Sequence, residues 1–481
     1  MKASIFRPNF PFSPAKFPIF YGWIILVASV FGVLTSIPGQ TIGVSVFTDH
    51  LIAATGLSRL QLANAYLVGT VTSGCLLPFG GKLLDRLGAR RVIVLAAVGL
   101  GLTLGYLAMC DRLAIFFTAL LPFPQVSTTE TITPPIAPEV AAVLLVIGFV
   151  SLRFCGQGML TMTSRTTLGK WFDKRRGQVS GIEGVFIASG FSIAPYFFSQ
   201  AIAALGWRGT WLILSGIIGL GMSTVGWLLF RDNPEICGLR MDGEIRPAEI
   251  AKTEIAKTEI AKTEIKQTTD IVSIEKEKPE EAIWGFTRQQ AISTVVFWAV
   301  TLAFCSQALS ITGITFNIVS IGTEMGIAEA DIVRIFVPIA VVSTAVGYGV
   351  GLACDRVRIQ YLFIFMMTFQ AIGIAAIANL DTIGMIVPAV VGLGVSGGCF
   401  GTLSTVVLPR FFGRKHLGAI AGVQMMAIVI ASALGPSLLA NSQSVTGSYT
   451  SGLYACCLFA PIVVMLMVFV RSPNVEKTSR W

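Results

Sequence analysis

Charged side chains are scarce in this sequence. Only 13% of the 481 residues are charged, 54% are hydrophobic, and the mean hydropathy is +0.75. So little charge cannot cover the surface of a soluble protein, and the composition is typical of a chain whose solvent is mostly lipid. The sequence therefore predicts an all-α membrane protein.

The residues from which most enzyme and metal sites are built are also rare. The two histidines, His50 and His416, fall at predicted loop ends, and no nucleophile or metal constellation accompanies them. Nine cysteines lie mostly in apolar segments without metal-site spacing, which favours small packing residues. A membrane enzyme is therefore the least expected class, and neither a cofactor nor a metal is predicted.

Long apolar runs are the dominant pattern that is present. A helix needs about 20 mostly apolar residues to cross the roughly 30 Å hydrocarbon core. The first run is longer than a signal-peptide core and has no obvious cleavage site, so it is interpreted as a true span. Twelve spans are predicted, at approximately 20–47, 60–82, 91–110, 140–164, 178–203, 209–230, 290–320, 332–353, 360–379, 382–408, 417–440 and 450–470.

Lysine and arginine predict the orientation of these spans. The two tails and alternate loops carry 30 of the 35 basic residues, with 165–176 counted as one such loop. By the positive-inside rule these segments face the cytoplasm. We therefore expect a multi-pass protein of a plasma or inner membrane with both termini inside. The net charge of +9 is interpreted as an orientation signal, and nucleic acid is not expected as a partner.

The chain contains its first half twice. A second set of landmarks, from Trp171 to Pro195, recurs at an offset of 241 as Phe412 to Pro436. Parallel duplication of membrane segments is typical of transporters whose pathway runs between the repeats. An extra external loop at about 121–139 explains most of the difference between the two offsets. The first set recurs at an offset of 270, with Gly43, Gly56, Gly81, Asp85 and Arg86 matching Gly313, Gly326, Gly351, Asp355 and Arg356.

A charged segment separates the two halves. It contains three copies of Ala-Lys-Thr-Glu-Ile between 251 and 265. Such a composition favours a solvated tether, and a regulatory docking role is the alternative. The predicted domains are an N-terminal six-helix bundle at 1–230, a cytoplasmic linker at 231–289, and a C-terminal six-helix bundle with a short tail at 290–481.

Two short motifs resemble those of a known transporter family. The first, Gly-Gly-Lys-Leu-Leu-Asp-Arg-Leu-Gly-Ala-Arg-Arg at 80–91, resembles the conserved loop of the major facilitator superfamily, and 351–356 is its weaker copy. Small glycines let helices approach, while charged residues can form a latch in one state and release it in another. The resemblance implies a cytoplasmic gate made of Gly81, Asp85, Arg86, Gly351, Asp355 and Arg356.

The second motif, at 153–158, resembles the superfamily's Arg-x-x-Gln-Gly motif with its glutamine one position late. If hydrocarbon ends near Ser164, then Arg153 lies roughly 16 Å deep at 1.5 Å per residue. A cation at that depth is costly unless it faces a cavity or a partner. We therefore expect Arg153 to bind substrate, and a prop between neighbouring helices is the alternative.

Further segments resemble one branch of the superfamily. Tyr21-Gly22-Trp23, the 171–177 loop, the 231–239 segment and Phe297-Trp298 are similar to bacterial monocarboxylate-transporter-like and oxalate/formate-antiporter members. The resemblance covers most of the chain and implies the major facilitator fold, twelve helices in two pseudo-symmetric six-helix bundles. Members that move small carboxylates often carry a basic residue within the C-terminal half, and none is found here. This departure makes Arg153 the only deeply placed cation expected, which leaves a monoanion or a neutral solute open.

Polar residues within the spans complete the predicted site. Glu183 is the one acid well inside a span, where it suits uptake and release of a coupling proton. A plain carboxylate near a helix start and the basic residues 174–176 is the alternative. Pro38 and Gly39 interrupt the first span next to Gln40, which favours a bend that lines the pathway, and a kink that only shapes packing is the alternative. Four further side chains are expected to bind substrate with Arg153: Gln40, Gln157, Gln307 and Ser310.

These features predict a secondary active transporter of a small organic anion, of the monocarboxylate class, that works by alternating access. A proton would accompany the anion, or a counter-anion would be exchanged for it. Replacing Arg153 by Gln is expected to abolish uptake while the protein still folds. Two alternatives remain open: an exporter of drugs or hydrophobic metabolites, and a non-transporting solute sensor that signals through the linker.

Overall fold

The computed structural model describes residues 6–120, 136–243, 284–380 and 383–469. The three Ala-Lys-Thr-Glu-Ile copies, most of the predicted external loop and the C-terminal tail lie outside the described residues. Within the described part every regular element is a helix, and one isolated antiparallel bridge joins Gly285 to Gly413.

The predicted number of spans agrees with the helices. Ten helices are long and apolar enough to cross a membrane, and Gly22–Leu34 is a shorter apolar helix. One of the ten, Arg176–Leu229, contains two predicted spans, because Gly206 adopts φ 71° and breaks the helix between them. The positive φ favours glycine. The expected twelve-helix, all-α fold is therefore confirmed.

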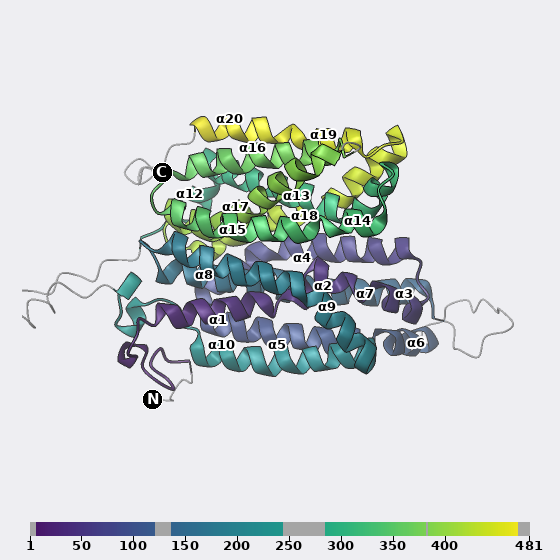
Figure 1. Ribbon diagram of the computed structural model, residues 1–481. Helices are drawn as coiled ribbons and strands as arrows, with labels where there is room; N and C mark the ends of the chain where they lie inside the picture. The colour runs from purple at the N-terminus through teal and green to yellow at the C-terminus, as the bar shows by residue number, and fades with distance from the viewer. Residues whose placement is uncertain (1–5, 121–135, 244–283, 381–382, 470–481) are drawn as a thin grey trace, which may run out of the picture.

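The first half lies in one layer of the molecule (Figure 1). Its long helices run side by side, and short helices follow the first and third spans. The elements are α1 (Gly22–Leu34), α2 (Thr41–Ser45), α3 (Thr48–Thr55), α4 (Arg59–Leu87), α5 (Ala89–Leu107), α6 (Cys110–Leu120), α7 (Pro138–Arg153), α8 (Thr161–Trp171), α9 (Arg176–Gly216) and α10 (Ser223–Leu229).

The second half forms the other layer (Figure 1). We call the end of the molecule at which α1 begins and α20 ends, on the left in Figure 1, the terminal face. The elements of this half are α12 (Arg288–Ile292), α13 (Val295–Glu324), α14 (Glu329–Arg334), α15 (Phe336–Cys354), α16 (Ile359–Ile377), α17 (Ile386–Phe412), α18 (Leu417–Thr446), α19 (Thr450–Cys457) and α20 (Phe459–Phe469).

Each half is held together by its own apolar core. One cluster of buried side chains draws only on the first half, and two draw only on the second. Between the halves, α4 packs along α18 and α9 packs along α15. These two pairs are related by the internal repeat, since α4 corresponds to α15 and α9 to α18. The duplication read from the sequence is therefore a duplication of contacts as well.

The structure agrees with one expected helix break and differs at one predicted span boundary. The first span is interrupted by a turn of 3-10 helix at Ile37–Gly39, as Pro38 and Gly39 predict. The fourth span does not end at residue 164, because α8 continues helically through Trp171 after a π-helical segment at Phe154–Leu160. Nearly all of α8 is buried by protein, so its Thr and Ser side chains do not face lipid. The placement of residues 165–171 in a loop was therefore wrong.

Candidate functional site

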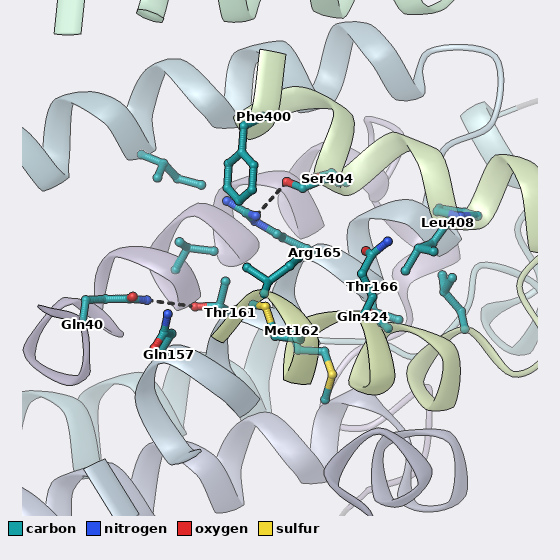
Figure 2. Close-up of a pocket in the computed structure, with 18 of the residues that line it drawn as sticks. Gln40, Gln157, Thr161, Met162, Arg165, Thr166, Phe400, Ser404, Leu408 and Gln424 are labelled. Carbon is teal, nitrogen blue, oxygen red and sulfur yellow. Dashed lines mark hydrogen bonds between the residues drawn. The ribbon is translucent and has the colours of Figure 1, made fainter. Parts of the chain in front are cut away.

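A cavity of about 220 Å³ lies between the two halves (Figure 2). Its walls come from α1, α8 and α9 of the first half, and from α17 and α18 of the second. The cavity is many times larger than the space of about 10–15 Å³ that one water molecule needs. It is smaller than the pockets of roughly 300–1,000 Å³ that enclose drug-sized ligands. The space therefore fits a small solute.

Arg165 is the one charged side chain among the described residues that line this cavity. It reaches from α8 toward α17, where its Nη1 donates to the Ser404 hydroxyl at 2.8 Å (Figure 2). Its Nε is buried and makes no hydrogen bond within the described chain. A guanidinium offers five N–H donors and no acceptor. This side chain therefore provides both charge and free donor capacity for an anion.

Glu183 lies on α9 close enough to Arg165 for the two charges to interact. Its Oε2 accepts a 3.3 Å hydrogen bond from the Thr405 hydroxyl of α17. Its Oε1 is buried without a partner among the described residues, and only 1% of the residue is exposed. Glu183 itself does not line the cavity, although Thr405 does. The two charged residues therefore form adjacent bridges between the halves.

Two amide side chains add unpaired polar atoms to the cavity. Gln157, in the π-helical segment, and Gln424, on α18, both line it, as Figure 2 shows. The Oε1 of Gln157 and the Nε2 of Gln424 are buried without partners in the described part of the chain. Gln40 also lines the cavity, and its Nε2 donates to Thr161 at 3.4 Å. Buried polar groups are normally paired, so unpaired ones call for a ligand or water.

Arg153 lies elsewhere. It is 2% exposed and does not belong to the cavity lining. Its Nη1 donates to the Gly39 carbonyl and to the Thr41 hydroxyl, both at 3.3 Å. Its guanidinium also stands over the Tyr66 ring, 5.4 Å from the centroid. These contacts tie α7 to the break between α1 and α2, so the geometry matches the alternative of a prop between helices. The Nε of Arg153, like that of Arg165, is buried without a partner among the described residues.

Gln307 and Ser310 are also away from the cavity. Both lie on α13 inside the second half and are 3% or less exposed. Gln307 accepts from Ser396 at 3.3 Å, and Ser310 accepts from Gln370 at 3.3 Å. Of the five predicted substrate-binding residues, the structure therefore brings Gln40 and Gln157 to the cavity and leaves the other three in helix-to-helix contacts.

The predicted gate residues meet at the terminal face. Asp85, near the end of α4, accepts from the backbone N–H groups of Gly418 at 2.9 Å and Ala419 at 2.7 Å. Asp355, after α15, accepts from those of Gly177 at 3.0 Å and Gln178 at 3.3 Å. Each carboxylate thus binds the first turn of a helix in the opposite half, where unpaired N–H groups attract negative charge.

Glycine allows these contacts. A Cβ atom on Gly81 would lie 2.1 Å from the carbonyl oxygen of Gly418, and one on Gly177 would lie 2.1 Å from that of Gly351. The helix backbones therefore touch across the halves at the terminal face. Arg86 and Arg356 are exposed, and neither forms an ion pair with another described residue. At this face the aspartates, not the arginines, make the contacts between the halves.

Sequence reasoning missed Arg165, Ser404, Thr405 and Gln424. The signal for Arg165 was present, since 161–167 reads Thr-Met-Thr-Ser-Arg-Thr-Thr. A run of small polar residues inside a helix marks a surface that faces a cavity or another helix. It was interpreted as the end of a span because hydropathy falls there. Consequently the expectation that Arg153 is the only deeply placed cation was wrong.

Comparison of the sequence with protein-family models shows the family of the chain. The model of the Major Facilitator Superfamily matches residues 24–436. No curated protein sequence matches the chain. Among solved structures, the proton:xylose symporter XylE is similar at a TM-score of 0.62 with 16% identity, covering 94% of this chain and 96% of that one.

Two further structures share the fold. The human organic anion transporter MFSD10 has a TM-score of 0.58 and 11% identity, with 93% and 99% of the two chains covered. A bacterial homologue of the iron transporter ferroportin has a TM-score of 0.60 and 14% identity, with 92% and 98% covered. None of these three descriptions names a monocarboxylate or oxalate/formate carrier, and identities this low bear on the fold alone.

Proposed function

Because the chain belongs to the major facilitator superfamily, and is thus a multi-pass membrane transporter of small solutes, we propose that its solute is a small organic anion of the monocarboxylate class. The observation that supports this most is Arg165, a lone cation at a small cavity between the halves, with a buried Nε that lacks a partner among the described residues. One guanidinium balances one carboxylate. The segments that resemble the monocarboxylate branch favour the same class.

The cycle we propose is alternating access around this cavity. The terminal face, which the positive-inside rule assigns to the cytoplasm, is closed by the Asp85 and Asp355 latches. At the cavity, two further hydrogen bonds join the halves: Arg165 donates to Ser404, and Glu183 accepts from Thr405. An anion that takes Arg165 away from Ser404 removes one of these bridges, so substrate binding favours release of the seal.

Charge balance supports a proton as the coupling ion. Arg165 and Glu183 lie close enough for their opposite charges to attract each other, although they form no ion pair among the described residues. A bound carboxylate occupies the guanidinium and leaves Glu183 as an uncompensated buried charge, which is costly. A proton on Glu183 restores neutrality. We therefore propose proton symport, and exchange for a second anion is the alternative, in which Glu183 stays charged.

The unpaired amide atoms refine the proposed substrate. The amide nitrogen Nε2 of Gln424 is a donor, as is the guanidinium Nε of Arg165, and a carboxylate can accept from both. The amide oxygen Oε1 of Gln157 is an acceptor. A hydroxyl group on the substrate would donate to that acceptor. A small hydroxy acid therefore satisfies more of the cavity than an unsubstituted acid of the same size.

The test uses purified protein in liposomes. We would measure uptake of labelled lactate, propionate and lactamide with and without an inward proton gradient. The proposal predicts lactate uptake stimulated by the gradient, weaker propionate uptake, and none of the uncharged lactamide. Equal uptake of lactate and lactamide would contradict an anion site. Resistance to drugs on expression, without carboxylate uptake, would support an exporter, and solute binding without uptake would support a sensor.

A further inference from the structure

The linker between the halves touches the gate at both of its described ends. Residues 237–243 lie against the first half, and 284–286 lie against the second. These two short segments are far apart in sequence and have no sequence similarity to each other. They nevertheless bind the same structural feature in each half.

At its beginning the linker binds the loop that leads into α9. The carboxylate of Asp242 accepts from the backbone N–H groups of Asp173 at 3.0 Å, Lys174 at 2.8 Å and Arg175 at 3.3 Å. Asp242 has φ 56°, the left-handed region that residues other than glycine seldom adopt. A residue that adopts this backbone conformation while its carboxylate accepts three hydrogen bonds indicates a built contact and not a chance one.

At its end the linker binds the loop that leads into α18. The carbonyl oxygen of Trp284 accepts from the backbone N–H groups of Arg414 at 2.8 Å and Lys415 at 3.3 Å. The N–H of Phe286 donates to the Phe412 carbonyl at 2.8 Å. Gly285 is the β-bridge partner of Gly413, and a Cβ on Gly285 would lie 2.6 Å from the Lys415 nitrogen.

The internal repeat makes these two contacts equivalent. At the offset of 241, Asp173 corresponds to Arg414 and Lys174 to Lys415. The linker's two ends therefore occupy the same pair of N–H groups in each half, once with a side-chain carboxylate and once with a backbone carbonyl. The next free N–H groups along each helix are those taken by Asp355 and Asp85 from the opposite half.

A third contact joins the linker to both halves. Arg414 donates through Nη2 to Glu235 at 2.8 Å, and the two form an ion pair. Through Nη1 it donates to the carbonyl of Lys170 at 2.8 Å. The loop before α18 is therefore tied to the start of the linker and to the end of α8. The contacts of Glu235, Asp242 and residues 284–286 therefore all lie at the terminal face, beside those of Asp85 and Asp355.

We propose that the two ends of the linker are part of the gate, with Asp242 and Trp284-Gly285 as its positioning residues. They fix the two loops so that the first turns of α9 and α18 present their N–H groups to Asp355 and Asp85. Loss of either end loosens its own loop and, because the halves move as bodies, the latch of the other half too. A binding partner or modification that detaches an end would then open the terminal face. This inference does not depend on which solute is carried.

Hydrogen exchange followed by mass spectrometry on the full-length protein in nanodiscs tests it. The test variant is Asp242→Ala. The matched control is Asp331→Ala, because the Asp331 carboxylate is exposed and pairs with Arg334 away from the terminal face. We expect backbone exchange in Asp242→Ala to rise by about tenfold or more, the factor that about 1.4 kcal/mol represents, over 173–182. The deciding readout is the peptide over 417–422, which Asp242 does not contact, where exchange should also rise.

The opposite end gives the reciprocal experiment. Gly285→Ala should raise exchange over 414–422 and also over 177–182, whereas the Asp331→Ala control should change neither region. Asp242→Asn keeps one acceptor oxygen and should fall between wild type and Asp242→Ala. If both linker variants raise exchange only in the loop they touch, the linker ends are local supports and the proposal is wrong. A variant that unfolds is recognised because hydrogen exchange rises throughout α5 and α16. The variant at the other end of the linker then tests the proposal alone.

Discussion

The two halves of this transporter contribute alike to the contacts at the terminal face but unequally to the cavity between them. Asp85 and Asp355 occupy matching positions and bind matching helix starts. In contrast, the equivalents of Arg165 and Glu183 at the offset of 241 are Val406 and Gln424. The first half thus supplies both charges of the site, and the second half supplies hydroxyl and amide partners. In the account proposed here, closure of the terminal face needs an aspartate of each half to bind a helix start of the other. Recognition of a charged solute needs only one cation.

The largest effect is expected where that asymmetry is greatest. Arg165→Gln removes the charge that the anion needs, and hydrogen bonds to charged groups contribute about 1.5–3 kcal/mol each. Uptake of the carboxylate should fall by about 100-fold, measured as initial rate in liposomes. Arg165→Lys keeps the charge and should retain part of the activity. Uptake of Arg165→Gln at the wild-type rate would remove the basis of the anion proposal.

A second variant makes the halves alike. Glu183→Gln gives the first half the residue that the second half has at position 424. Because the site can then no longer take up a proton, stimulation by a proton gradient should disappear, while exchange of internal for external anion should stay within about threefold of wild type. The measurement is net uptake against exchange in the same liposomes. Gradient-driven uptake by Glu183→Gln would show that the proton is carried elsewhere.

A pair of glycine variants tests the symmetric part. Gly81→Ala and Gly177→Ala each place a Cβ 2.1 Å from a carbonyl oxygen of the opposite half. That clash is incompatible with the closed terminal face, so both should lower uptake by about tenfold or more, by a similar factor, and should expose the terminal face to water-soluble labels. Gly349→Ala, where a Cβ meets open space, is the control. A strong effect in one half only would contradict a symmetric gate.

The aspartate latches should differ modestly in strength. Asp85 is partly buried, whereas Asp355 is exposed and shares its hydrogen bonds with water. Asp85→Asn should therefore shift the protein toward opening at the terminal face by about tenfold, and Asp355→Asn by only about threefold. Distance measurements between spin labels on the two halves would follow the shift. A larger effect for Asp355→Asn would mean that burial does not set the strength of the latches.

The smallest effect on transport is expected at Arg153. Its contacts with Gly39, Thr41 and Tyr66 stabilise the first half, and it does not line the cavity. Arg153→Gln should lower the melting temperature by about 2–4 °C per kcal/mol lost and leave uptake by folded protein within about threefold. Uptake abolished in a variant of unchanged stability would restore Arg153 as a substrate residue.

The sequence predicted the fold well because its signals are local and repeated. Span length, the two offsets and the break at Pro38-Gly39 each depend on a few neighbouring residues, and each agrees with the structure. The recurrence of Gly81 and Asp85 also pointed to residues that contact the opposite half, and their role as a gate stays a prediction. Their partners were not located, since which backbone amides they meet depends on how the two halves pack.

The cavity was predicted less well for a physical reason. Depth along a span was estimated from hydropathy, yet α8 stays helical through a polar stretch because protein, not lipid, surrounds it. Arg165 was therefore assigned to a loop, and Arg153 was given its role. Likewise Gln307 lies on the wrong face of its helix for the cavity. Sequence alone locates a polar residue along a helix, but which face it occupies is decided by packing between helices.

The most direct test compares the two arginines in one binding experiment. Titration calorimetry on purified wild type, Arg165→Gln and Arg153→Gln would measure the affinity for lactate and for uncharged lactamide. We predict that wild type and Arg153→Gln bind lactate more tightly than lactamide, and that Arg165→Gln loses this preference. If Arg165→Gln keeps the preference, or folded Arg153→Gln loses it, then the cavity between the halves is not the anion site.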